Sequence, residues 1–224
     1  MEKNRTIIVK GVGKASVRPD LIVISLKLDS FCKAYDKATA LAQEKLEDLY
    51  KSLETVGFER KEVKTAGFNV RTKHDNVKDK NGNSVLMFLG YNIEHSLKVS
   101  FDFDLKRLSE TLNAISICKA KPNVDIKFTV KDDSGVKEEV LRNATINARR
   151  KADILALSSG VKLGKIVSIE YSWQDIELYS DTKYFDATSL LKMANIDIEP
   201  EDIKIEDVVT FIWEIEDDDS SHDL

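Results

Sequence analysis

Several features that would mark a particular class of protein are scarce in this sequence. Its 224 residues include only three prolines and nine glycines, which leaves little room for flexible linkers. No apolar run approaches the roughly 18 residues of a membrane-spanning helix, so we expect no membrane span. The N-terminal segment MEKNRTIIVKGVGK lacks the long apolar core of a signal peptide. We therefore expect a cytoplasmic protein, and a leader removed before residue 1 is the alternative.

Residues that bind metals or form disulfides are also few. The two cysteines, Cys32 and Cys118, are far apart in sequence, and we expect two unpaired thiols rather than a disulfide. The three histidines, His74, His95 and His222, show no His-x-x-x-His spacing, and the sequence has no Cys-x-x-Cys pair. The sequence therefore predicts no metal site.

Two glycine-containing segments invite a ligand-binding interpretation and do not support it. In Gly11–Ser16 the two glycines are two residues apart and Ala15 follows the lysine, whereas a phosphate-binding loop needs four intervening residues and a Ser or Thr. A calcium loop with Gly82 at its sixth position would begin at Val77 and end at Phe88, and neither can bind calcium. No Gly-x-Ser-x-Gly nucleophile motif occurs. We expect a non-enzymatic protein with no catalytic or cofactor-binding residue.

The composition and charge favour a soluble folded chain with an acidic C-terminal part. Apolar residues make up 42% and charged residues 33% of the chain. Residues 175–224 hold 16 acidic residues and three lysines, a net charge of −13, so the first 174 residues carry +8. The simple interpretation is a solvated acidic tail, and the alternative is that acidic and basic faces meet between subunits. Because the basic residues are dispersed among few aromatics, we expect no nucleic-acid binding.

Hydrophobic periodicity predicts the order ββαββαβαβ, then an irregular segment and a last strand. Strands with alternating apolar residues, together with long helices, indicate an α+β fold: a mainly antiparallel sheet backed by helices. The predicted strands are 6–9, 21–28, 62–74, 85–103, 124–130, 166–169 and 208–215, and the predicted helices are 31–56, 105–117, 136–159 and a short one near 187–194. We expect one domain over residues 1–216, with an insertion at 174–198, and an acidic disordered tail at 217–224.

Glycines sharpen this prediction at three places. Gly11 and Gly13 predict a bulge or sharp bend after the first strand. Gly160 is expected to end the long helix, and Lys162–Gly164 is expected to form a tight turn. The long helix has its apolar residues at three-to-four spacing on one face, which comprises Val140, Leu141, Ala144, Ala148, Ala152 and Leu155.

Four segments together resemble the SIMPL-domain family, also called DUF541. They are VKGVGKASVRPD at Val9–Asp20, VKTAGFNV at Val63–Val70, GYNIEHSLKVSF at Gly90–Phe101 and GVKLGKIVSIEYS at Gly160–Ser172. The resemblance extends from about Thr6 to Ile215. The segment at 174–198 departs from it, because relatives often have a low-complexity stretch there, and many relatives carry a secretion signal.

The resemblance implies that the protein binds other molecules rather than catalyses a reaction. The family has no established catalytic residues. Its periplasmic members resemble large homo-oligomeric, ring- or channel-like assemblies, some members are linked to oxidative-stress tolerance, and the family's name comes from a eukaryotic signalling adaptor.

We therefore expect a homo-oligomeric scaffold or interaction protein, and the alternative is a monomeric or dimeric module that binds a small ligand. Basic and aromatic side chains in the second half of the chain are the candidates for an interface between subunits. These candidates are Arg149, Arg150, Lys151, Tyr171, Trp173, Tyr179, Tyr184 and Phe185.

Overall fold

The computed structural model describes residues 5–78, 83–172, 178–182 and 199–217, and it has the predicted α+β character. The element order matches the prediction through the sixth strand, and the last strand then follows. Every strand pairing is antiparallel. The elements are β1 (Thr6–Val17), β2 (Leu21–Cys32), α1 (Tyr35–Glu54), a 3-10 turn (Arg60–Glu62), β3 (Lys64–Lys78), β4 (Ser84–Asp102), α2 (Leu105–Ser116), β5 (Asn123–Thr129), α3 (Ser134–Ser158), β6 (Val161–Glu170) and β7 (Ile203–Asp217).

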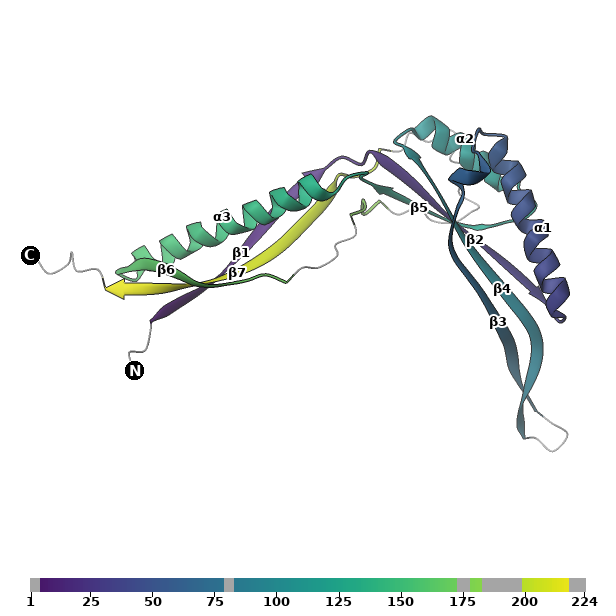
Figure 1. Ribbon diagram of the computed structural model, residues 1–224, viewed down its shortest axis with the longest axis horizontal. Helices are drawn as coiled ribbons and strands as arrows, with labels where there is room; N and C mark the ends of the chain where they lie inside the picture. The colour runs from purple at the N-terminus through teal and green to yellow at the C-terminus, as the bar shows by residue number, and fades with distance from the viewer. Residues whose placement is uncertain (1–4, 79–82, 173–177, 183–198, 218–224) are drawn as a thin grey trace, which may run out of the picture. The chain divides into compact units, whose positions relative to one another are not determined.

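These elements form two compact units, each with its own sheet (Figure 1). One unit combines α3 with a three-stranded sheet in the order β1-β7-β6. The other combines α1 and α2 with a four-stranded sheet in the order β3-β4-β2-β5. The expectation of a single domain over residues 1–216 stays a prediction. The expected helix near 187–194 and residues 218–224 of the expected tail lie outside the described residues.

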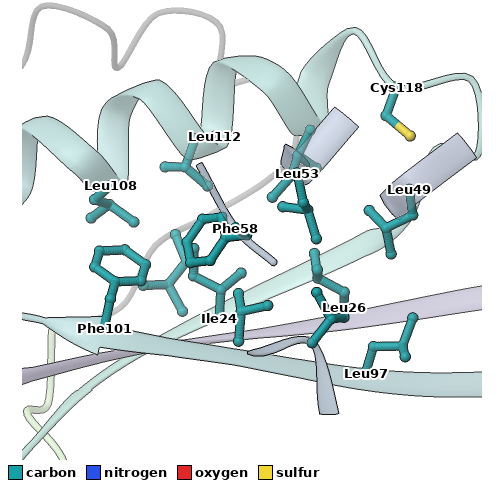
Figure 2. Close-up of a cluster of buried hydrophobic side chains, with 14 of the residues drawn as sticks. Ile24, Leu26, Leu49, Leu53, Phe58, Leu97, Phe101, Leu108, Leu112 and Cys118 are labelled. Carbon is teal, nitrogen blue, oxygen red and sulfur yellow. The ribbon is translucent and has the colours of Figure 1, made fainter. Parts of the chain in front are cut away.

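The core of the four-stranded unit lies between its sheet and its two helices (Figure 2). Leu49 and Leu53 of α1 and Leu108 of α2 are fully buried. They face alternate residues of the central strands, such as Ile24 and Leu97. Each such side chain stabilises the fold by about 1.5–3 kcal/mol through removal of its surface from water. The alternation predicted for Ile93–Phe101 is confirmed, because every second residue there is buried.

The core of the three-stranded unit depends on an unusually close approach of α3 to β1. A Cβ atom added at Gly11 would lie 2.0 Å from the carbonyl oxygen of Ala144, and one at Gly13 would lie 1.9 Å from that of Val140. The prediction of a bulge at these glycines is therefore wrong. β1 continues through both residues in unbroken register with β7, and the missing side chains make room for the helix.

Other sequence predictions need correction at element ends. Phe31 belongs to β2, not to the first helix, because the strand stays paired with β4 as far as Cys32. Lys162–Gly164 lies within β6 and forms no turn, although the pairing with β7 is irregular there. On α3, Leu155 is exposed and Ala156 is buried in its place. Gly160 follows α3 with a positive φ of 66°, as predicted.

Candidate interaction surface

The hairpin of β3 and β4 extends beyond the helices that cover the rest of its sheet (Figure 1). We call its outer part, residues 73–78 and 84–88, the arm. Four consecutive apolar residues of the arm are exposed: Val85 by 46%, Leu86 by 64%, Met87 by 46% and Phe88 by 39%. Contiguous exposed apolar side chains of this size are typical of a surface that contacts another molecule.

Both faces of the arm carry apolar side chains, because neighbouring residues of a strand point to opposite faces. Phe88 lies opposite His74 and Leu86 opposite Asn76, so these two apolar side chains share one face. Met87 opposite Asp75 and Val85 opposite Val77 occupy the other face. A two-stranded ribbon of this kind has no core of its own and is marginally stable in water unless something packs against it.

Aromatic rings connect the arm to the body of its unit. His74 packs edge-on against Phe88, Phe88 against Tyr91, and Tyr91 against Tyr35 at the start of α1, with ring centroids 5.3–5.6 Å apart. Because such edge-to-face contacts each add about 0.5–1.5 kcal/mol, they hold the near end of the arm in place. The far end has no such support among the described residues.

A shallow depression lies at the base of the arm on the other face of the sheet. It has a volume of about 310 Å³ and is lined by Asp29, Phe31, Arg71, Thr72, Lys73 and Asn92. The Lys73 ammonium lies 5.6 Å from the centroid of the Phe31 ring. The depression therefore presents two cationic side chains beside one aromatic ring.

The residues predicted from sequence to form an interface have various surroundings in the structure. Lys151 donates to the carbonyl oxygen of Lys10 at 3.0 Å, and Arg149 pairs with Asp153 one turn along α3. The Tyr171 hydroxyl donates to Asp207 at 2.9 Å, which raises the pKa of the phenol because the phenolate would face that carboxylate. Arg150 and Tyr179 are exposed. Trp173, Tyr184 and Phe185 lie outside the described residues.

His95 is the one buried histidine among the described residues. It lies on the helix-facing side of β4, where Thr65 Oγ1 is 3.1 Å from its Nε2 and the Phe68 ring packs edge-on against the imidazole. Burial lowers the pKa of His95, because the imidazolium form loses hydration. In the described part of the chain, no three His, Cys, Asp or Glu residues are grouped so that they could hold a metal ion. The surroundings of His95 therefore indicate a packed structural residue.

Sequence analysis did not single out the arm, although a signal was present. Residues 85–89 read Val-Leu-Met-Phe-Leu, with no polar residue between them. A strand with one face buried and the other in water alternates, as residues 93–101 do. An unbroken apolar run at the end of a hairpin instead indicates two apolar faces, and no helix is adjacent in sequence to cover them.

Comparison with known proteins agrees with this architecture. The family model described as SIMPL, "Protein of unknown function (DUF541)", matches residues 7–213, which is nearly the whole chain. This chain belongs to the SIMPL family. The expectation drawn from the four sequence segments is thereby confirmed, and both units of this SIMPL protein contribute residues to the match.

Two curated proteins are similar to this SIMPL chain over 163 residues. They are the 26 kDa periplasmic immunogenic proteins of Brucella melitensis, at 26% identity, and of Brucella abortus (strain S19), at 25% identity. Each match covers 73% of this chain and 65% of the relative, so the chain spans slightly less than two thirds of the length of these relatives. Among the described helices of this chain, none has the length and apolar character needed to cross a membrane.

Proposed function

We propose that this SIMPL protein is a non-enzymatic scaffold that assembles with copies of itself through the arm. The observation that carries the proposal is the arm itself, whose two faces expose Val85, Leu86, Met87 and Phe88. Burial of such side chains against a second molecule contributes about 25 cal/mol per Å² of apolar surface removed from water. A second copy offers an arm of the same kind, so the arms of two copies are the proposed contact.

The deciding experiment is the solution mass of purified protein measured by light scattering over a range of concentrations. We expect a mass well above 25.3 kDa for the wild-type chain. Leu86→Lys places a charge on the arm and should reduce the mass to that of one chain. The matched control is Leu157→Lys, at an apolar residue of α3 that is 83% exposed and far from the arm in sequence, and it should leave the mass unchanged. A monomeric wild-type protein at every concentration would overturn the proposal.

The uneven charge distribution supports a second contribution to assembly. If the acidic part at 175–224 pairs with basic surface of another copy, salt should weaken the assembly, because screening at 1 M salt reduces the Debye length to about 3 Å. Contacts made only by the apolar arm should persist in the same salt. Light scattering at low and high salt therefore separates the two contributions.

A module that binds a small ligand is the second candidate, and the depression at the base of the arm favours it. Arg71 and Lys73 suit an anionic group, and the Phe31 ring suits an apolar or aromatic one. The support is weaker than for the arm, because the depression is open and about 310 Å³ in volume, at the lower end of the range for ligand sites. Thermal stabilisation by an anionic metabolite, lost in Arg71→Ala, would support this candidate.

Compartment and physiological process belong to the same proposal. The relatives are named as periplasmic, whereas the start of this sequence led us to expect a cytoplasmic protein. Fractionation of cells that express the natural gene, followed by detection with an antibody, distinguishes the two compartments. A role in oxidative-stress tolerance rests on family resemblance alone, and survival of a deletion strain under peroxide would test it.

A further inference from the structure

The two sheets have four edge strands, and they differ in how they are protected. An edge strand exposes a row of backbone N–H and C=O groups that can pair with another strand. The edge at β1 is closed by side chains of α3. Asn147 Oδ1 accepts from the N–H of Val12 at 3.0 Å, Asn143 Nδ2 donates to the carbonyl of Lys14 at 3.1 Å, and Lys151 Nζ donates to that of Lys10 at 3.0 Å.

Two of the remaining edges are poor templates for another strand. β5 has seven residues, and β6 has ten residues with two irregularities in its register. Short strands and bulges are usual means of preventing edge-to-edge pairing. The β3 edge is different, because β3 has 15 residues. Its pairing with β4 is irregular at two places, but only the irregularity between Thr65 and Gly67 inserts an extra residue in β3; at the other, between Lys73 and His74, the extra residue is Leu89 of β4. Of the residues from Gly67 to Lys78, only Val77 is partly buried and all the others are exposed.

We propose that two copies of this protein pair antiparallel along β3, about a two-fold axis at His74. In this register, each residue of one copy faces the residue equally far on the other side of His74 in its partner. Lys73 then faces Asp75 of the partner, and Asp75 faces the partner's Lys73. The proposal deepens the proposed function, on which it rests, by naming the strand and the register through which the copies meet.

Charge complementarity selects this register over neighbouring ones. Opposite residues of an antiparallel pair have Cβ atoms about 4.5–5.5 Å apart, close enough for the Lys73 ammonium to reach the Asp75 carboxylate. The remaining cationic residues face uncharged ones, since Arg71 faces Val77 and Lys78 faces Val70. Moving the centre one residue towards Lys73 places two lysines opposite each other, and moving it one residue towards Asp75 places two aspartates opposite each other.

The pairing also gives an ion-pair partner to two charged side chains. The Lys73 ammonium otherwise lies over the Phe31 ring, and Asp75 accepts from the backbone N–H of Asn76. In the part of the chain that the structure describes, neither Lys73 nor Asp75 forms an ion pair, and β3 has extensive contacts only with β4. Joining two β3 strands converts two separate two-stranded arms into one four-stranded sheet, which meets the minimum for independent stability. Leu86 and Phe88 stay on the outer strands of that sheet, because Asn76 and His74 of β3 lie opposite them and nearer the two-fold axis.

Charge exchange tests the register directly. Lys73→Asp places two aspartates opposite each other at both symmetric positions and should weaken dimer formation about tenfold, as measured by analytical ultracentrifugation. The double variant Lys73→Asp with Asp75→Lys restores opposite charges and should return the dimer constant to within about threefold of wild type. Lys64→Asp is the matched control, because Lys64 lies on the same strand outside the paired segment. It should not weaken the dimer, so no second substitution should be needed to restore the dimer constant.

A disulfide test is independent of charge. His74→Cys should form a disulfide-linked dimer on mild oxidation, because the two-fold axis brings the residue against itself and disulfides need Cβ atoms about 3.8 Å apart. Arg71→Cys is the control, since residue 71 faces residue 77 of the partner, and wild-type protein gives the background from Cys32 and Cys118. Efficient crosslinking at residue 71 and not at residue 74 would overturn the register.

The outcomes separate this inference from the proposed function. If wild-type protein assembles, Leu86→Lys abolishes assembly, and neither the charge exchange nor His74→Cys has the expected effect, then the register is wrong and the self-assembly proposal stands. If wild-type protein is monomeric at all concentrations, both fail together.

Discussion

At the scale of single residues, Gly11 shows how a missing side chain can position a helix. Gly11→Ala adds a Cβ atom only 2.0 Å from the Ala144 carbonyl oxygen and 2.6 Å from the Ala148 Cβ, so β1 and α3 must move apart. We expect a loss of about 3 kcal/mol in the free energy of unfolding, at the upper end for overpacking, measured by urea denaturation. Gly135→Ala is the control, because no atom lies within 4 Å of the added Cβ. It should be neutral or slightly stabilising.

His95 makes a prediction about pH at the same scale. Its pKa is lowered by burial in the folded state, so below the ordinary imidazole pKa the unfolded chain binds more protons than the folded one. Stability should therefore fall as pH decreases from about 6.5, at no more than about 1.4 kcal/mol per pH unit for this one group, until the folded pKa is reached. Urea denaturation of His95→Gln between pH 7.5 and 5 should show a shallower decline than wild type. The exposed His74 supplies the control variant His74→Gln, and an unchanged slope in His95→Gln would contradict the prediction.

At the scale of elements, the contacts of α3 with the edge of β1 should stabilise the strand and keep it from pairing with other molecules. Asn147→Ala removes the acceptor for the Val12 N–H and should cost about 1 kcal/mol. Removal of Asn143 and Lys151 as well should lower the free energy of unfolding by about 2–3 kcal/mol. The triple variant should also associate through the uncovered edge of β1. This association should persist when Leu86→Lys is added, because it does not involve the arm. Arg150→Ala, on the exposed surface of the same helix, should change neither stability nor mass. Denaturation and light scattering measure the two effects, and a triple variant as stable as wild type would contradict this role.

The elements also show what sequence reasoning can reach. Periodicity placed α2 within one residue of its observed end, because its apolar face packs against a core along its whole length. It failed at Gly11 and Gly13, where the cause is a helix more than 120 residues away in sequence. The same limit applies to Phe31, whose pairing with Asn92 overrides the helical pattern that follows it. The arm was missed because exposure depends on which elements stop short of the hairpin.

At the scale of the whole molecule, the two units differ in how the chain forms them. The core of the four-stranded unit is drawn entirely from residues 22–128, whereas the three-stranded unit combines β1 with elements that follow residue 130. We therefore expect a fragment of residues 20–129 to fold alone and to unfold cooperatively when followed by circular dichroism. Residues 130–217 without β1 should not fold, because β7 loses the strand that pairs with it from Ile203 to Glu214 and α3 loses the strand that it contacts most. A disordered 20–129 fragment would instead favour the single-domain expectation from the sequence.

The spacing of the hydrogen bonds between α3 and β1 also limits where the helix can lie along the strand. Their three helix residues are four apart, a rise of about 6.0 Å per step, and their three strand residues are two apart, about 6.8 Å per step. The observed donor–acceptor distances are 3.0–3.1 Å at all three contacts, so the side chains take up the difference of about 0.8 Å per step. A slip of the helix by one turn would reduce three aligned contacts to two. The length of the matched segment thus sets one position for α3 along the strand.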